Sequence, residues 1–200
     1  APRMPMQLAP DPVWGLPRKP WSGGQSIVVC WRPSPLLGMQ GWSLLLNALS
    51  RLAEDLDAPV RWLAFHRHQD GALLDWLTDQ GAVPPGLRSR STTVIPSSLD
   101  TVFASVRKAR LVIPMRLHAL ILARLAHCPM AALSYDPKVE AAAAMAGIPC
   151  SSLDALPAEP TLLKQWREAM DSPADSDQIE RIRAAAAHHG NHLRRYLPQR

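Results

Sequence analysis

The chain has 200 residues, of which 47% are hydrophobic and 20% are charged. A chain of this size and composition buries one full core without disulfide bonds or metal ions. No apolar run approaches the roughly 20 residues that cross a bilayer, so the sequence predicts no transmembrane segment. The net charge of +5 could suggest nucleic acid, but much of it comes from arginines near the C-terminus, which are more typical of a solvated helix face: Arg181, Arg183, Arg194, Arg195 and Arg200.

The three cysteines, Cys30, Cys128 and Cys150, are spaced far apart and form no CxxC pair. Their odd number and wide spacing argue against a disulfide framework, and the absence of histidines at ligand spacing argues against zinc. We therefore expect buried thiols in a reducing compartment, a cytoplasmic protein without a metal, and at most a peripheral contact with the inner face of the cell membrane.

Residues 1–25 are rich in proline and glycine, too broken for a helix or a central strand. The first residues, Ala1 to Met4, lack both an initiator methionine and the layout of a signal peptide. We expect this segment to be a linker, and the chain to be a piece of a longer protein whose N-terminal domain precedes it.

Short apolar runs alternate with helical patterns between residues 26 and 155. The expected strands are 26–31, 60–65, 92–95, 110–113 and 130–133. The expected helices are 44–56, 70–80, 98–108, 116–126 and 138–146, with a loop at 81–91. This alternation predicts an α/β domain with a Rossmann-like parallel sheet and helices on both faces. Residues 156–200 show only helical patterns, broken near 172–176, and predict a C-terminal helical appendage.

Arg116 and His118 directly follow the predicted strand 110–113. In open α/β sheets ligands bind beyond the carboxyl ends of the strands, where helix N-termini present unpaired N–H groups to anions. Arg116 could hold an anion with its guanidinium, and the imidazole of His118 could transfer a proton. The alternative is that the two form an ordinary solvated pair at the start of a helix.

The next strand, 130–133, is followed by a second polar group, Tyr135 to Lys138. Asp136 suits the N-cap of the following helix and Pro137 its first position. Lys138 could pair with an acidic ligand or could be an ordinary lysine of the first helical turn. Two neighbouring strand ends therefore carry polar groups, which favours a site over a chance arrangement.

The two segments Val112-Ile-Pro-Met-Arg-Leu-His-Ala-Leu-Ile121 and Ser134-Tyr-Asp-Pro-Lys-Val139 together resemble the polysaccharide pyruvyl transferase family, in particular its CsaB-like branch of cell-wall polymer pyruvylation. The segment from Asp11 to Trp14, the arginine at Arg32 after the first strand, and the loop from Phe65 to Asp70 are similar to the family more weakly. The similarity covers most of residues 10–155.

This resemblance implies the C-terminal donor-binding half of a two-domain, glycosyltransferase-B-like fold. It implies transfer of a pyruvyl group from phosphoenolpyruvate to a cell-wall or exopolysaccharide sugar as a ketal, without a cofactor. The partners would be phosphoenolpyruvate, a saccharide acceptor that is free or lipid-linked, and the protein's own N-terminal domain. His118 would be catalytic, and the donor would be bound by Arg32, Arg116, Leu117, Tyr135 and Lys138.

Further polar and aromatic residues near strand ends are candidates for the same cleft. Asp70 and Asp136 follow strand ends, and Trp31 adjoins Arg32 and could stack on a sugar. His66 and His68 flank Arg67 just past a strand end and could form part of the donor cleft or a metal site. No third ligand is visible, so a metal is not expected.

Two other functions stay open. A nucleotide-sugar glycosyltransferase of the same architecture also needs an anion site at these strand ends, and a non-catalytic polyanion-binding domain would need no chemistry at all. No glycine-rich phosphate loop follows a strand, because Gly23 and Gly24 precede the first one. The sequence therefore argues against a nicotinamide or ATP enzyme.

Overall fold

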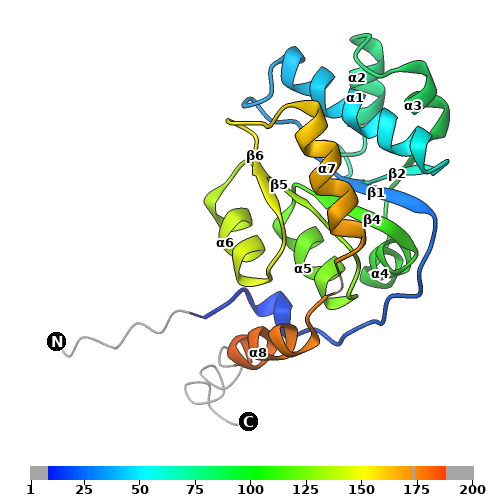
Figure 1. The fold of residues 1–200 in the computed structure, drawn as a ribbon. Coiled ribbons are helices and arrows are strands. Elements are labelled where there is room, and N and C mark those ends of the chain that lie inside the picture. Colours follow the sequence, from blue (N-terminus) through cyan, green and yellow to red (C-terminus); the bar gives the residue numbers. More distant parts are fainter. Residues whose placement is uncertain (1–8, 173, 188–200) are drawn as a thin grey trace.

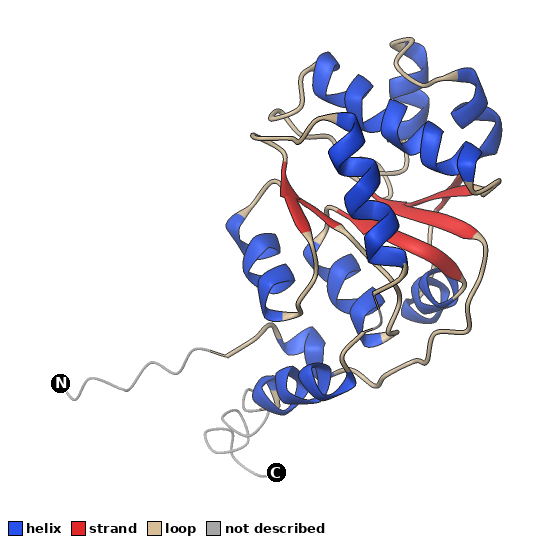
Figure 2. Ribbon diagram, viewed as in Figure 1, coloured by secondary structure: helices blue, strands red, loops and turns tan. Residues whose placement is uncertain are grey.

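The fold is described by a computed structural model that covers residues 9–172 and 174–187. Figure 1 shows a central sheet with helices on both sides, and Figure 2 marks the same elements by type. Residues 1–8 of the predicted linker, and Arg194, Arg195 and Arg200 of the basic C-terminal segment, lie outside the described residues.

The described strands are all parallel, as the alternating sequence pattern predicts. Four of them pair in the order β3-β2-β1-β4, and β5 pairs with β6. A bridge between Val112 and Met130 joins the two groups, so the strands follow the Rossmann order 3-2-1-4-5-6. The bounds are β1 Ser26–Cys30, β2 Val60–Leu63, β3 Ser91–Val94, β4 Ala109–Pro114, β5 Ala132–Ser134 and β6 Cys150–Ser152.

Both faces of the sheet are buried, and successive residues of a strand enter different cores. Ile27 and Val29 of β1 pack into one core, while Val28 and Cys30 pack into the other. Because both faces of β1 are buried, its sequence is an uninterrupted apolar run. One core is closed by α1 Met39–Asp55, α2 Leu73–Asp79, α3 Pro85–Arg90 and α7 Glu159–Met170; the other by α4 Leu99–Arg107, α5 Leu117–Leu125, α6 Pro137–Met145 and α8 Ser176–Ala186.

The C-terminal helices continue these two layers. Helix α7 lies along α1 and places Trp166, 1% exposed, in the first core. Helix α8 packs on the 3-10 turn η1, Pro12–Gly15, which contributes the buried Trp14 to the second core. Helices α7 and α8 and the 3-10 turn of the linker are therefore integral to the domain (Figure 1).

The expected elements are confirmed within about five residues at each end, but three short elements were not predicted. The segment expected to be too broken for a helix contains the 3-10 turn η1. The loop expected at residues 81–91 contains α3, in which Pro85 occupies the first turn and Leu87 is fully buried. The strand β6 was not expected, because Cys150–Ser152 is short and mostly polar. It pairs with β5 through its backbone, which gives little hydrophobic signal in the sequence.

The cysteines are free thiols, as expected. Cys30 and Cys128 are fully buried, and burial together with Glu140 raises the pKa of Cys150 to about 11. Among the described residues no helix is both long enough and apolar enough to span a membrane, and no cluster of side chains suits a metal ion.

Truncating Trp166 tests whether α7 belongs to the core. Trp166→Ala should lower the free energy of unfolding by about 3–5 kcal/mol, because it leaves a large cavity between α7 and α1. Trp76→Ala is the matched control: Trp76 is 44% exposed, so its loss should cost within about 0.5 kcal/mol. Urea unfolding followed by circular dichroism measures both, and equal losses would contradict the assignment of α7 to the core.

Candidate functional site

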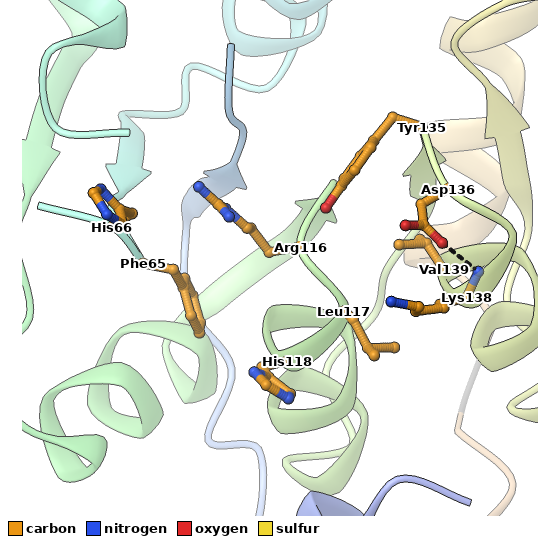
Figure 3. A pocket seen from close by; sticks show the side chains of 9 residues that line it. All are labelled: Phe65, His66, Arg116, Leu117, His118, Tyr135, Asp136, Lys138 and Val139. Carbon is orange, nitrogen blue, oxygen red and sulfur yellow. Dashed lines mark hydrogen bonds between the residues drawn. The ribbon is translucent and has the colours of Figure 1, made fainter. Parts of the chain in front are cut away.

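A cavity of about 340 Å³ lies beyond the carboxyl ends of β2, β4 and β5. Figure 3 shows its walls. Phe65 and His66 lie on one side with the Arg116 guanidinium, and Tyr135 and Asp136 lie on the other. The complete lining is Phe65, His66, Arg116, Leu117, His118, Tyr135, Asp136, Lys138 and Val139. The two polar groups found in the sequence, after β4 and after β5, therefore meet in one cavity.

Arg116 is held in place by an almost fully buried carboxylate. Its Nε donates to Oδ2 of Asp70 at 3.1 Å and its Nη2 donates to Oδ1 at 2.5 Å. The Asp70 side chain is only 2% exposed and that of Arg116 is 20% exposed. Two guanidinium nitrogens are thus occupied, and among the described residues no group accepts from Nη1, which remains for a ligand.

Asp70 also fixes the loop that follows β2. Its Oδ2 accepts hydrogen bonds from the backbone N–H groups of Phe65, at 3.0 Å, and His66, at 2.9 Å. One carboxylate therefore ties the loop after β2 to Arg116 after β4. The expectation that Asp70 lines the cleft is wrong, because it lies behind Arg116 and holds it.

The N-terminus of α5 is open toward the cavity. Arg116 is its N-cap residue but makes no side-chain capping bond. No described residue accepts from the amides of Leu117 and His118, which an uncapped helix leaves unpaired. The neighbouring helix α6 is capped by Asp136, whose Oδ1 accepts from the N–H of Lys138 at 2.8 Å (Figure 3). Asp136 therefore serves the helix, and α5 offers the amides and the positive end of its dipole to an anion.

Arg32 reaches the cavity only through Tyr135. Its guanidinium lies 4.7 Å from the centre of the Tyr135 ring, and Nη1 donates to the Tyr135 hydroxyl at 3.1 Å. Tyr135 lines the cavity and Arg32 does not. A direct contact of Arg32 with a ligand in this cavity would require it to leave Tyr135.

His118 lies in the first turn of α5 with a side chain that is 56% exposed. Its Nε2 is 3.6 Å from Oδ2 of Asp11, whose other oxygen caps η1 through the N–H of Val13. His118 and Phe65 also line a neighbouring hollow of about 390 Å³. The imidazole thus stands between two cavities, where it can exchange a proton with a ligand in either.

Trp31 does not reach the cleft, so its expected contact with a sugar is wrong. The side chain is 2% exposed and packs edge-on against Trp62, with ring centroids 5.3 Å apart, and beside Trp42 at 6.2 Å. Hydrophobic packing at the end of β1 explains why tryptophan follows this strand.

Of the two histidines after β2 that could form part of the donor cleft, His66 lines the cavity and His68 does not. Phe65 and Val139 also line the cavity, and the sequence did not identify either as a site residue. A useful signal was available: the loop after β2 ends at the same edge of the sheet as Arg116, because the strands are parallel.

Cys30 ends β1 beside the site but cannot act as a nucleophile there. Burial raises the pKa of its thiol, and the nearby Asp70 carboxylate and Cys128 raise it further. The side chain is also fully buried. Cys30 therefore supplies no nucleophile to the cavity.

No protein-family model matches this sequence, and no curated protein is significantly similar to it. Solved structures do share the fold. The glycotransferase of kitacinnamycin matches with a TM-score of 0.52 and 13% identity over 91% of this chain and 46% of that one. A mutant of the Thermobaculum terrenum O-GlcNAc transferase matches with a TM-score of 0.50 and 16% identity over 92% of this chain and 35% of that one.

The chain thus spans less than half the length of these two structures. At such low identity the likeness concerns the fold alone. The predicted architecture is confirmed: the chain has the Rossmann-like half of a glycosyltransferase-B-like fold with a helical C-terminal part.

The ion pair can be tested through stability. Asp70→Asn should lower the free energy of unfolding by about 3 kcal/mol, because it leaves the Arg116 guanidinium without its counter-charge in a largely buried place. The control is Asp55→Asn, which removes the partner of Arg167 from a half-exposed pair and should cost less than about 1 kcal/mol. Similar losses in the two variants would show that Asp70 contributes no more than a surface carboxylate.

Proposed function

We propose that the cavity is the donor site of a polysaccharide pyruvyl transferase and binds phosphoenolpyruvate. The observation that carries this proposal is the convergence of three anion-binding groups in one cavity: Nη1 of Arg116, the uncapped amides of α5 and Lys138. A phosphate bound by a planar guanidinium and helix amides is a common combination in proteins. The resemblance of residues 112–121 and 134–139 to the pyruvyl transferase family adds the identity of the anion.

The reaction needs groups that move protons. The enol carbon of phosphoenolpyruvate takes up a proton, a sugar hydroxyl adds to the adjacent carbon and loses its own proton, phosphate leaves, and a second hydroxyl closes the ketal. The two hydroxyl protons balance the one on the new methyl group and the one on the released phosphate. His118 lies within the cavity and is exposed enough to serve one of these transfers.

Arg32 and Tyr135 complete the proposed donor site. The Tyr135 hydroxyl lines the cavity and already accepts a hydrogen bond from Arg32, so it can donate its own proton to an anion. Arg32 would then act on the donor through Tyr135, or directly after moving. The acceptor sugar, free or lipid-linked, would approach from a second domain, since the chain covers only part of its structural neighbours.

A nucleotide-sugar glycosyltransferase is the second candidate, favoured by the fold of the neighbours alone. Its donor would bring a diphosphate to the same amides and the same arginine. The two candidates differ in what the rest of the cavity holds: a three-carbon acid in one and a nucleoside in the other.

Ligand protection separates these candidates. Phosphoenolpyruvate should raise the melting temperature of the chain, and UDP-N-acetylglucosamine should not. At a ligand concentration one hundred times its Kd, the expected gain in the free energy of unfolding is about 2.7 kcal/mol. Lys138→Ala should reduce the effect, whereas Lys164→Ala, at an exposed position of α7, should leave it unchanged. Protection by the UDP-sugar and not by phosphoenolpyruvate would reject the pyruvyl transferase in favour of the glycosyltransferase.

Catalysis by His118 makes a separate prediction for a protein that also contains the acceptor-binding domain. His118→Gln should slow phosphate release from phosphoenolpyruvate by about 10²–10⁴-fold, the usual contribution of a general acid or base. Binding of phosphoenolpyruvate should change little, because Arg116 and Lys138 remain. A variant that keeps the wild-type rate would remove His118 from the chemistry.

A further inference from the structure

We infer that His66 is a substrate-binding residue of the cavity, donating a hydrogen bond from Nε2–H to a phosphate or carboxylate oxygen of the bound anion. The inference rests on the proposed function, because it takes the cavity as the donor site. His66 lines the cavity from the loop after β2, on the same side as the Arg116 guanidinium (Figure 3). Its neighbour His68 does not line it.

The tautomer of His66 is set by a contact within its own loop. The backbone N–H of Gln69 donates to Nδ1 of His66 at 3.2 Å. A nitrogen that accepts a hydrogen bond carries no proton, so the neutral ring carries its proton on Nε2. His66 is therefore prepared as a donor at the far end of its ring.

The backbone of His66 is fixed from both sides. Its N–H donates to Oδ2 of Asp70 at 2.9 Å, and its carbonyl accepts from the N–H of Asp70 at 2.9 Å. Because the same carboxylate holds Arg116, the histidine and the arginine share one buried anchor. Two donors fixed by one anchor can contact one anion without a large loss of conformational entropy.

An N–H donor suits this cavity because the charge of Arg116 is already paired with Asp70. Among the described residues the Asp136 side chain accepts only from the backbone N–H of Lys138, so the Lys138 ammonium still contributes its charge to the lining. Dipoles, which the α5 amides and an imidazole N–H supply, add to that attraction for an anion. Asp70 is the carboxylate nearest to His66 in the loop, and its oxygens are occupied by Arg116 and by backbone amides.

Two substitutions separate this role from a purely structural one. Asparagine places its side-chain oxygen near Nδ1, so His66→Asn keeps an acceptor for Gln69 and loses the distant donor. Glutamine places its amide nitrogen near Nε2, so His66→Gln keeps the donor and loses the acceptor. We expect His66→Asn to weaken the binding of phosphoenolpyruvate by about tenfold, the value of one hydrogen bond to a charged group. His66→Gln should bind phosphoenolpyruvate with a Kd within about threefold of wild type. Its side-chain N–H takes the place of the imidazole donor, and only the neutral hydrogen bond from Gln69 is lost.

The measurement is the Kd of phosphoenolpyruvate and of inorganic phosphate for the 200-residue chain by calorimetry, with His68→Asn as the matched control. The inference is overturned if the asparagine variant binds as wild type and the glutamine variant does not, because the turn alone would then matter. The inference is also overturned if both His66 variants bind phosphoenolpyruvate as wild type does while Lys138→Ala binds it more weakly. That result would still support the proposed donor site.

Binding measurements with inorganic phosphate distinguish a failure of the proposed function from a failure of the inference about His66. If the chain binds phosphate but not phosphoenolpyruvate, the proposed function fails, and the same ranking of variants with phosphate still supports or overturns the role of His66. If the chain binds neither, both proposals are overturned.

Discussion

The site depends on one buried ion pair. Asp70 accepts two hydrogen bonds from the Arg116 guanidinium and two from the backbone of the loop after β2. A carboxylate that is 2% exposed is tolerable only because all of these donors converge on it. The pair therefore sets the position of Arg116 at the open end of α5, and it ties together two chain segments that are 46 residues apart. Without it, the side of the cavity formed by Phe65, His66 and Arg116 would not have a fixed shape.

The sheet topology explains why this pair lies where a ligand would bind. In the order 3-2-1-4-5-6 the chain changes direction between β1 and β4, and the loops after these two strands separate at that point. Arg32 follows β1, Arg116 begins the helix after β4, and Tyr135 follows β5. The backbone bond from Met115 N–H to the Cys30 carbonyl holds the ends of β1 and β4 together. The fold therefore gathers these three residues without their being near in sequence.

The sequence was sufficient for the layers but not for the contacts between loops. Apolar runs such as Val28 and Val29 predict buried parallel strands, and polar residues after two strand ends predict Arg116 and Tyr135 at one edge. The roles of Asp70 and Trp31 could not be predicted, because a carboxylate or an indole after a strand looks alike whether it faces solvent or the core. Only the packing of the loop after β2 against α5 decides that Asp70 turns inward and that His66 turns toward the cavity.

The balance of charge in the cavity bears on how a reaction product would leave. The charge of Arg116 is offset by Asp70, so part of the affinity for an anion must come from the helix amides and from neutral donors. Affinity that comes from helix amides and neutral donors depends on close, directional contacts, which are lost when the ligand changes shape. Under the proposed function, phosphoenolpyruvate bound at both its phosphate and its carboxylate would be held by more of these contacts than the inorganic phosphate released from it. The cavity would then retain the substrate and release the product.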